Sequence, residues 1–173
     1  MMQYNTYVKL PIGTSGYSLK YGQATMYVTG IPYSVGTTSS SVSGWTSSNT
    51  GSEQSSLLLK GSTASIVSNG IFFAPGNMAV NVFVTAAGYH GWGSSTLNMY
   101  INATESSAVT SGTKISVPGD QFYPDQAKWV EYEQACTMTS AKKNISIYGT
   151  ISGRGLTGFA RSIMIRKVKV EYK

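Results

Sequence analysis

The chain has 173 residues, enough for one domain with a hydrophobic core, and a formal net charge of +6 from 13 Lys and Arg against 7 Asp and Glu. Charged residues make up 12% of it, roughly half of the ~25% usual in globular proteins. Ser, Thr, Asn and Gly supply the polarity instead, together with 12 Tyr. This composition is typical of a β-rich extracellular protein and not of a cytosolic enzyme.

The sequence contains one cysteine and one histidine, Cys136 and His90. An intrachain disulfide, a cysteine-based metal site and a multi-histidine metal site are therefore excluded, and we expect neither a metal nor a cofactor. Cys136 shares the apolar face of a strand-like run, which predicts a buried small side chain rather than a reactive thiol.

No stretch approaches the roughly 20 apolar residues of a membrane span, so membrane insertion is not expected. The opening residues MMQYNTYVKLP have neither the basic nor the apolar region of a secretory signal, so no signal peptide is visible. Two explanations suit an extracellular composition without an export signal. One is a virion protein that leaves the cell on lysis, and the other is a secreted protein whose signal was removed.

Residues 1–36 form either an N-terminal arm or extra strands of the domain that follows. Residues 37–56 are rich in Ser and Thr, as a linker would be. Trp45 within them favours an ordered loop held against the surface. We predict a single domain over residues 1–173.

Apolar and polar residues alternate with a period of two along most of the chain, and no stretch keeps helical spacing for three turns. Turns with Gly or Pro separate these segments, at 11–13, 74–77, 117–120 and 123–125. The predicted strands are 3–9, 24–28, 57–59, 78–84, 97–101, 130–138, 144–151 and 159–172. Most have one apolar and one polar face, which predicts an all-β fold, an antiparallel β-sandwich over one core.

The segment AGYHGWG at 87–93 carries three ring side chains, Tyr89, His90 and Trp92. One interpretation is a plain turn between two strands. The other is a ligand platform, because Tyr and Trp rings stack on the apolar faces of sugars and glycines let a ligand approach. These three residues and Trp45 are the candidate ligand-binding residues.

The acidic residues do not form a convincing catalytic pair. Glu131 and Glu133 share the polar face of one strand, whereas glycoside hydrolysis needs two carboxyl groups across a cleft, about 5–10 Å apart. We therefore expect no catalytic residues and no enzymatic activity. A small glycan-cleaving enzyme is the remaining third class.

The segment GRGLTG at 153–158 matches the G-x-G-x-x-G dinucleotide fingerprint. That fingerprint needs a helix after the glycines, but residues 159–172 are β-branched and alternate in polarity. We therefore predict a hairpin loop that leads into a closing strand, and no nucleotide site.

In the closing strand, the apolar residues change from odd to even positions. Ile163 and Ile165 lie at odd positions, whereas Val168 and Val170 lie at even positions. All four can face one core only if the strand contains one extra residue, so we predict a β-bulge at 166–167.

Basic residues gather late in the chain, and the candidate partner or edge contacts are Arg161, Arg166, Lys167 and Lys169. A nucleic-acid footprint is one interpretation. No recognition helix, RNP-like aromatic pair or zinc motif accompanies the charge, so a nucleic acid is not the expected partner. The alternatives are a solvated or edge strand protected by lysines, or a face that docks on an acidic partner.

From Trp45 onward the order of features resembles the jelly-roll carbohydrate-binding modules of xylanases and other glycanases, whose relatives occur in bacteriophage tail and baseplate proteins. The landmarks are LLLK at 57–60, FFAPG at 72–76, MAVNVFV at 78–84, Trp129 and IMIRKVKVE at 163–171. The glycanase modules often carry a calcium-holding Asp pair in the closing strand, where this chain has Arg166 and Lys167. The resemblance therefore does not extend to a metal or to xylan specificity.

The resemblance implies a jelly-roll β-sandwich without catalytic activity. Together with the composition, it leads us to expect a bacteriophage virion protein in the tail, the baseplate or the capsid decoration. Its expected partners are other virion proteins, further copies of itself in a homo-oligomer, and a cell-surface glycan. The alternative is a secreted bacterial carbohydrate-binding module or lectin-like domain.

Overall fold

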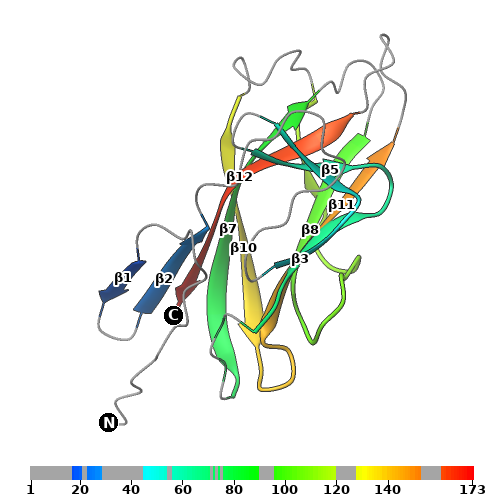
Figure 1. The fold of residues 1–173 in the computed structure, drawn as a ribbon. Coiled ribbons are helices and arrows are strands. Elements are labelled where there is room, and N and C mark those ends of the chain that lie inside the picture. Colours follow the sequence, from blue (N-terminus) through cyan, green and yellow to red (C-terminus); the bar gives the residue numbers. More distant parts are fainter. Residues whose placement is uncertain are drawn as a thin grey trace.

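The computed structural model describes residues 17–20, 23–28, 45–53, 56–70, 72, 74, 76–89, 96–119, 128–152 and 161–173. Within these ranges the regular elements are strands, β1 to β12, and they form two antiparallel sheets that face each other (Figure 1). The predicted all-β sandwich is therefore confirmed. No helix in the described ranges has the length and apolarity needed to cross a membrane. The predicted strand 3–9 lies outside the described residues.

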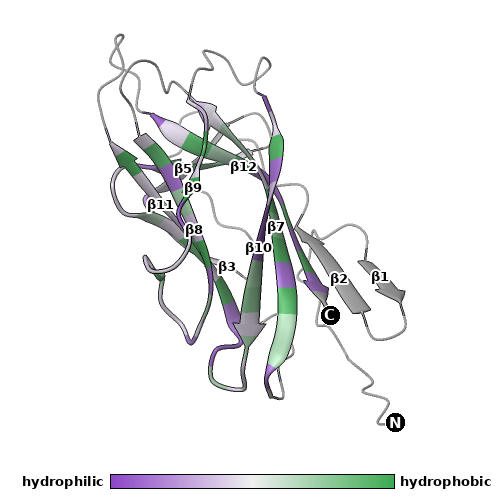
Figure 2. Ribbon diagram, turned by 180° about the vertical axis from the view of Figure 1, so that it is seen from behind, coloured by the Kyte–Doolittle hydropathy of each residue, from purple (hydrophilic) through white to green (hydrophobic). Residues whose placement is uncertain are grey.

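Sheet A is built around two long strands, β7 (Met78–Tyr89) and β12 (Ser162–Tyr172), which pair antiparallel. The strand β10 (Val130–Met138) pairs with the other side of β7. From Val80 to Val84 of β7, buried side chains alternate with partly exposed ones, and Figure 2 shows β7 as mainly hydrophobic with interrupting hydrophilic bands. This is the pattern expected of a sheet with one face on a core.

Two hairpins follow one another along the remaining side of β12. Its first half pairs with β5 (Ser56–Lys60), which pairs in turn with β4 (Thr50–Glu53). Its second half pairs with β2 (Gln23–Val28), which pairs with β1 (Tyr17–Lys20). Figure 1 shows this second hairpin beside the sandwich, next to the C-terminal half of β12.

Sheet B consists of five strands among the described residues. Their order is β3 (Trp45–Ser48), β6 (Ala64–Ser68), β11 (Asn144–Ser152), β8 (Thr96–Thr104) and β9 (Ile115–Ser116). The chain therefore passes repeatedly between the sheets. After β8 and β9 in sheet B, the chain forms β10 in sheet A and then β11 in sheet B again.

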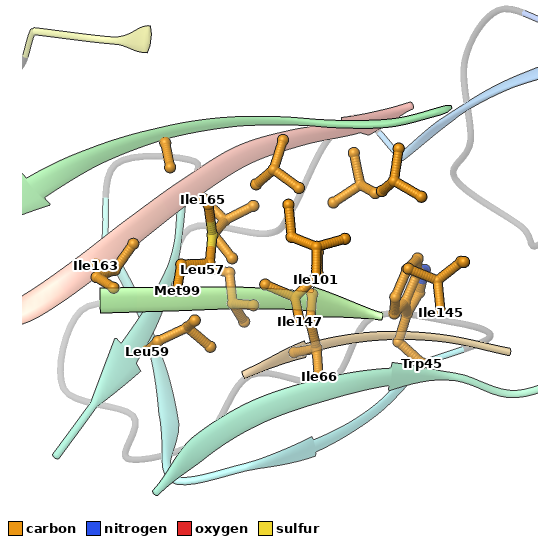
Figure 3. Close-up of a cluster of buried hydrophobic side chains, with 14 of the residues drawn as sticks. Trp45, Leu57, Leu59, Ile66, Met99, Ile101, Ile145, Ile147, Ile163 and Ile165 are labelled. Atoms are coloured by element: carbon orange, nitrogen blue, oxygen red, sulfur yellow. The ribbon is translucent and has the colours of Figure 1, made fainter. Parts of the chain in front are cut away.

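The core lies between the two sheets, where alternate side chains of both meet (Figure 3). Its central residues are Leu57, Leu59, Ile163 and Ile165 from sheet A and Ile66, Met99, Ile101, Ile145 and Ile147 from sheet B. Most of these side chains are fully buried. Burying a Leu or Ile side chain contributes about 1.5–3 kcal/mol, so this cluster dominates the favourable side of folding.

The predicted β-bulge in the closing strand is confirmed. Ile165 pairs with Ala86 and Lys167 pairs with the adjacent residue Thr85, so Arg166 is the extra residue. Ile163 and Ile165 before the bulge, and Val168 and Val170 after it, all belong to the core. The neighbour of β12 also changes at this point, from β5 at residues 162–165 to β2 at residues 168–171.

The second half of the segment 37–56, predicted as a loop, forms the strands β3 and β4 instead. Between them Asn49 adopts a left-handed conformation with φ of 51°, which Asn tolerates better than most residues. Its side-chain amide donates to Thr63 Oγ1 at 3.0 Å, and its carbonyl accepts from Lys60 N at 2.9 Å. These strands were not predicted because Ser and Thr make up three of the four residues of β3 and two of the four of β4, so neither shows an alternation of apolar and polar residues.

The closing strand lies inside sheet A, because β12 has a partner strand on both sides. The predicted edge role of its basic residues is therefore wrong. The glycine segment 153–158 lies outside the described residues, but the element that follows it is the strand β12. The helix that a dinucleotide site requires is replaced by a strand, as predicted.

Candidate functional site

The outward face of sheet B carries two tyrosines in direct register. Met99, Ile101 and Ile147 point into the core, so Tyr100 on β8 and Tyr148 on β11 lie on the opposite, outer face. The two residues pair directly across the strands, and both are partly exposed. Side chains in such a pair have Cβ atoms about 4.5–5.5 Å apart, so the two tyrosines are direct neighbours on this face.

The neighbours of this pair are hydroxyl and amide side chains. Ser65 on β6 pairs with Tyr148, and Ser48 on β3 pairs with Ser65. On one side of this row, Thr150 pairs with Asn98, whose Oδ1 lies 3.3 Å from Ser116 Oγ. We name the set of Ser48, Ser65, Asn98, Tyr100, Tyr148 and Thr150 the tyrosine face. None of these side chains is charged.

A loop between β8 and β9, residues 105–114, borders the tyrosine face on its other side. Ser146 and Asn102 form the next pair along the strands, and both hold this loop. The backbone N of Val109 donates to Ser146 Oγ at 3.0 Å, and Asn102 Nδ2 donates to the carbonyl of Ser111 at 2.9 Å.

Two further side chains fasten the base of the same loop. Thr104 Oγ1 donates to the carbonyl of Ser107 at 2.6 Å, and Asn144 Nδ2 donates to the carbonyl of Glu105. The loop is thus a rim fixed by hydrogen bonds, and a ligand on the tyrosines would lie against it.

Trp45 and Tyr89, the two predicted ligand-binding residues that the structure describes, do not lie at this face. Trp45 is 7% exposed, belongs to the core and meets Phe72 edge to face with ring centroids 6.3 Å apart (Figure 3). Trp45 therefore stabilises the sandwich from within instead of offering a ring at the surface. Its position at the start of β3, opposite Ser68, turns it inward.

Tyr89 is also buried, in a small apolar cluster on the outer side of sheet A with Leu58, Ala87 and Met164. Trp129 packs against this cluster, and the guanidinium of Arg166 lies 4.0 Å from the centre of its ring. His90 and Trp92 lie outside the described residues, and a ligand role for them stays a prediction.

Gly88, which the sequence suggested as a point of ligand approach, makes room for the chain itself. A Cβ atom there would overlap the carbonyl oxygen of Pro118 and lie 2.7 Å from Gly119 Cα. The segment that follows β9 is held close to Gly88 through Val117. The backbone N of Val117 donates to the carbonyl of Leu97 at 2.8 Å, and the Val117 side chain is buried in the core.

The predicted basic contacts interact mainly within the chain. Arg161 is 7% exposed, and its Nη1 donates to the carbonyl of Ser152 at 3.2 Å. Lys167 pairs with Glu131 at 3.7 Å. Lys169 pairs with Glu171 at 2.9 Å and lies 3.9 Å from the centre of the Phe83 ring. Together with Arg166 on Trp129, these contacts tie β12 to its neighbours.

Cys136 occupies the inner side of β10, partly buried against the core. Burial raises the pKa of its thiol to about 11, and a backbone hydrogen bond opposes this only in part. A thiol with so high a pKa is a poor nucleophile at neutral pH, which agrees with the predicted structural role. Burial also raises the pKa of Tyr132 on the same side of the strand.

The alternation in the strands predicted at 97–101 and 144–151 puts Tyr100 and Tyr148 on polar faces, but it does not bring the two residues together. The missing information was that β8 and β11 are neighbours, although β9 and β10 lie between them in the chain. Once that pairing is known, the alternation alone puts both rings on one outer surface.

No protein-family model and no curated protein matches the sequence. Solved structures do match. The C-terminal CBM6 module of a marine laminarinase from Zobellia galactanivorans is 10% identical, over 84% of this chain and 98% of its own length, with a TM-score of 0.44. The CBM22-1 xylan-binding domain from Paenibacillus barcinonensis is 14% identical, over 78% of this chain and 89% of its own, with a TM-score of 0.47.

A third similar structure is the enzymatically active domain of tailspike protein 4 from bacteriophage CBA120. It is 14% identical and is matched over 75% of this chain but only 19% of its own length, with a TM-score of 0.46. In fold, the chain is thus similar to carbohydrate-binding-module β-sandwiches and to part of a phage tailspike, which is the resemblance predicted from the sequence.

Proposed function

We propose that the chain is a non-catalytic glycan-binding module whose ligand lies on the tyrosine face. The observation that carries this proposal is the register pair of Tyr100 and Tyr148, partly exposed on an outer sheet face of otherwise uncharged polar side chains. Tyrosine is enriched at binding interfaces because its ring offers an apolar surface and its hydroxyl a hydrogen-bonding group.

The chemistry of the tyrosine face suits a sugar. A sugar ring presents an apolar C–H face, which packs on an aromatic ring, and a rim of hydroxyl groups, which needs hydrogen-bond partners. On this face the Ser48 hydroxyl is exposed and the Thr150 hydroxyl belongs to a partly exposed residue, and a hydroxyl both donates and accepts hydrogen bonds. These groups hold no ionised acid or base for proton transfer near neutral pH, so the face supports binding rather than hydrolysis.

Binding to a panel of soluble polysaccharides, measured by affinity electrophoresis and calorimetry, tests this proposal. Replacing Tyr100 or Tyr148 by Ala should weaken binding about tenfold or more, which is at least about 1.4 kcal/mol. Thr137→Ala is the matched control, because Thr137 is exposed on β10 of the other sheet. Unchanged affinity in both tyrosine variants would refute the proposed site.

The predicted place on a bacteriophage particle is a separate proposal, which does not depend on the tyrosine face. A virion protein is present at fixed stoichiometry and is usually a symmetric oligomer. Mass spectrometry of purified particles and light scattering of the isolated protein test both points. Absence from the particles together with a monomeric state would favour the secreted alternative.

A further inference from the structure

The tyrosine face ends at a lysine, and the geometry points to a glycan that carries an anionic substituent. We infer that Lys114 is the residue that recognises this anionic group, while Tyr100 and Tyr148 hold the adjoining sugar rings. This inference rests on the proposed function and names the ligand class of the same site.

The position of Lys114 follows from two observations on either side of it. Towards the C-terminus, Ile115 pairs with Met99 and Ser116 with Asn98 in the β8–β9 ladder. Towards the N-terminus, a Cβ atom on Gly112 would lie 3.1 Å from Asn102 Oδ1. Residues 112 and 116 therefore lie beside residues 102 and 98, and the antiparallel register puts Lys114 beside Tyr100.

The side chain of Lys114 belongs to the outer face of sheet B. Ile115 packs on the core, and Ser116 Oγ lies 3.3 Å from Asn98 Oδ1 on the outer face. Because side chains alternate along an extended segment, Lys114 shares the side of Ser116. Lys114 is exposed, so its ammonium group can meet a ligand in solution.

Lys114 completes a row that crosses the whole of sheet B. The row runs through Ser48, Ser65, Tyr148, Tyr100 and Lys114. Strands lie about 4.8 Å apart, so the row is about 19 Å long, enough for a short stretch of an extended glycan. The 105–114 loop borders the row along one side, so a linear ligand would lie across the strands rather than along them.

Lys114 supplies the positive charge of this row. The ion pairs found among the described residues, Lys167 with Glu131 and Lys169 with Glu171, lie on the outer face of sheet A and do not involve Lys114. The tyrosine face itself has no acidic side chain to compete with a ligand. The net charge of +6 favours the approach of an anionic polymer in addition.

A neutral glycan would gain at most a hydrogen bond between a hydroxyl and the ammonium group at the end of the row, whereas a carboxylate or sulfate would gain an ion pair with a charge-assisted hydrogen bond. Both anions share this chemistry. Their difference in shape is of little consequence to Lys, which acts as a flexible point charge.

The test compares polymers that share a backbone but differ in charge. Polygalacturonate and fully methyl-esterified polygalacturonate form the carboxylate arm, and carrageenan and chemically desulfated carrageenan form the sulfate arm. Calorimetry on the full chain should show at least one anionic polymer binding about tenfold more tightly than its neutral counterpart. Lys114→Gln should remove that preference while leaving the affinity for the neutral polymer unchanged.

Two variants control the experiment. Lys114→Arg keeps the charge and should keep the preference. Lys142→Gln removes an exposed lysine from the turn between β10 and β11 and should change nothing. The wild-type preference should also weaken as salt is raised, because the contact is an exposed one, and this salt dependence should be lost in Lys114→Gln.

The outcomes separate the inference from the proposed function. Equal binding of charged and neutral polymers, or a charge preference that survives Lys114→Gln, overturns the role of Lys114. If tyrosine-dependent binding persists in either case, the proposed function stands. If neither arm binds to the wild-type chain, both proposals fail for these glycans, and the inference is rejected with the function on which it rests.

Discussion

At the scale of single residues, Gly88 shows how tightly one end of the sandwich is closed. Its missing side chain lets the backbone at Pro118 and Gly119 cross directly against β7. Gly88→Ala would push a methyl group into that backbone, which cannot move aside as a flexible side chain could. We expect a loss of about 1–3 kcal/mol or more in the free energy of unfolding, measured by urea denaturation.

Gly76→Ala is the matched control for that experiment, because a Cβ atom at Gly76 would meet nothing within 4 Å. Its free energy of unfolding should stay within a few tenths of a kcal/mol of the parent chain. A Gly88→Ala protein as stable as Gly76→Ala would mean that the segment 117–119 does not pack as described.

At the scale of elements, the bulge in β12 decides which residues face the core. Deletion of Arg166 would make the strand continuous and leave the pairs of β12 with β7 on both sides of the bulge unchanged, so the isoleucines before the bulge and the valines after it would all still face the core. The variant would lose the local bend of the bulge and the contact of Arg166 with Trp129. The deletion variant should therefore fold, with a loss that is small beside the roughly 5–15 kcal/mol of stability typical of a domain.

Arg166→Ala separates the bulge from the side chain that occupies it. The extra residue remains, and only the contact of the guanidinium with Trp129 is lost. An exposed contact of this kind contributes about 0.5–1 kcal/mol. Circular dichroism and chemical denaturation should therefore show a folded chain with a cooperative transition for both variants, the deletion variant being the less stable because it also loses the bend of the bulge. A deletion variant that does not fold would contradict the assigned register.

The elements that the sequence predicts well are those with a clean alternation. The ranges predicted around 78–84, 97–101, 130–138 and 144–151 correspond to β7, β8, β10 and β11, and even the bulge followed from parity. The strand β6 escaped prediction because all five of its side chains are buried, so no alternation is visible. The strands β3 and β4 escaped because Ser and Thr dominate them.

The candidate site depended on a different kind of information. Alternation assigned Tyr100 and Tyr148 to outer faces, but their proximity arises from the pairing of β8 with β11, strands that are not consecutive in the chain. In the same way, Trp45 is buried because the opposite sheet covers it. The sequence around Trp45 does not show which residues of that sheet lie against it. Local patterns therefore identified which residues face outward, and only the topology showed which of them meet.

At the scale of the whole molecule, the two ends of the sequence contribute differently to sheet A. The core residues that the structure describes lie between Trp45 and Val170 in the sequence. Within the described residues, the hairpin of β1 and β2 joins the rest of sheet A only through the pairing of β2 with the second half of β12. A fragment of residues 45–173 keeps β12 paired with β7 along its length and keeps all of sheet B. We expect it to unfold cooperatively, at a lower temperature than the full chain.

The same fragment should bind glycan with unchanged affinity, because the tyrosine face lies on sheet B, away from β1 and β2.

A shorter fragment of residues 50–173 is the matched comparison, since it also lacks β3 and the buried ring of Trp45. Removal of a core Trp side chain alone costs about 3–5 kcal/mol, so this fragment should lose its cooperative transition. Calorimetric melting of the three proteins makes the comparison. If residues 45–173 melt without a cooperative transition, residues 1–44 belong to the core of the sandwich rather than to its margin.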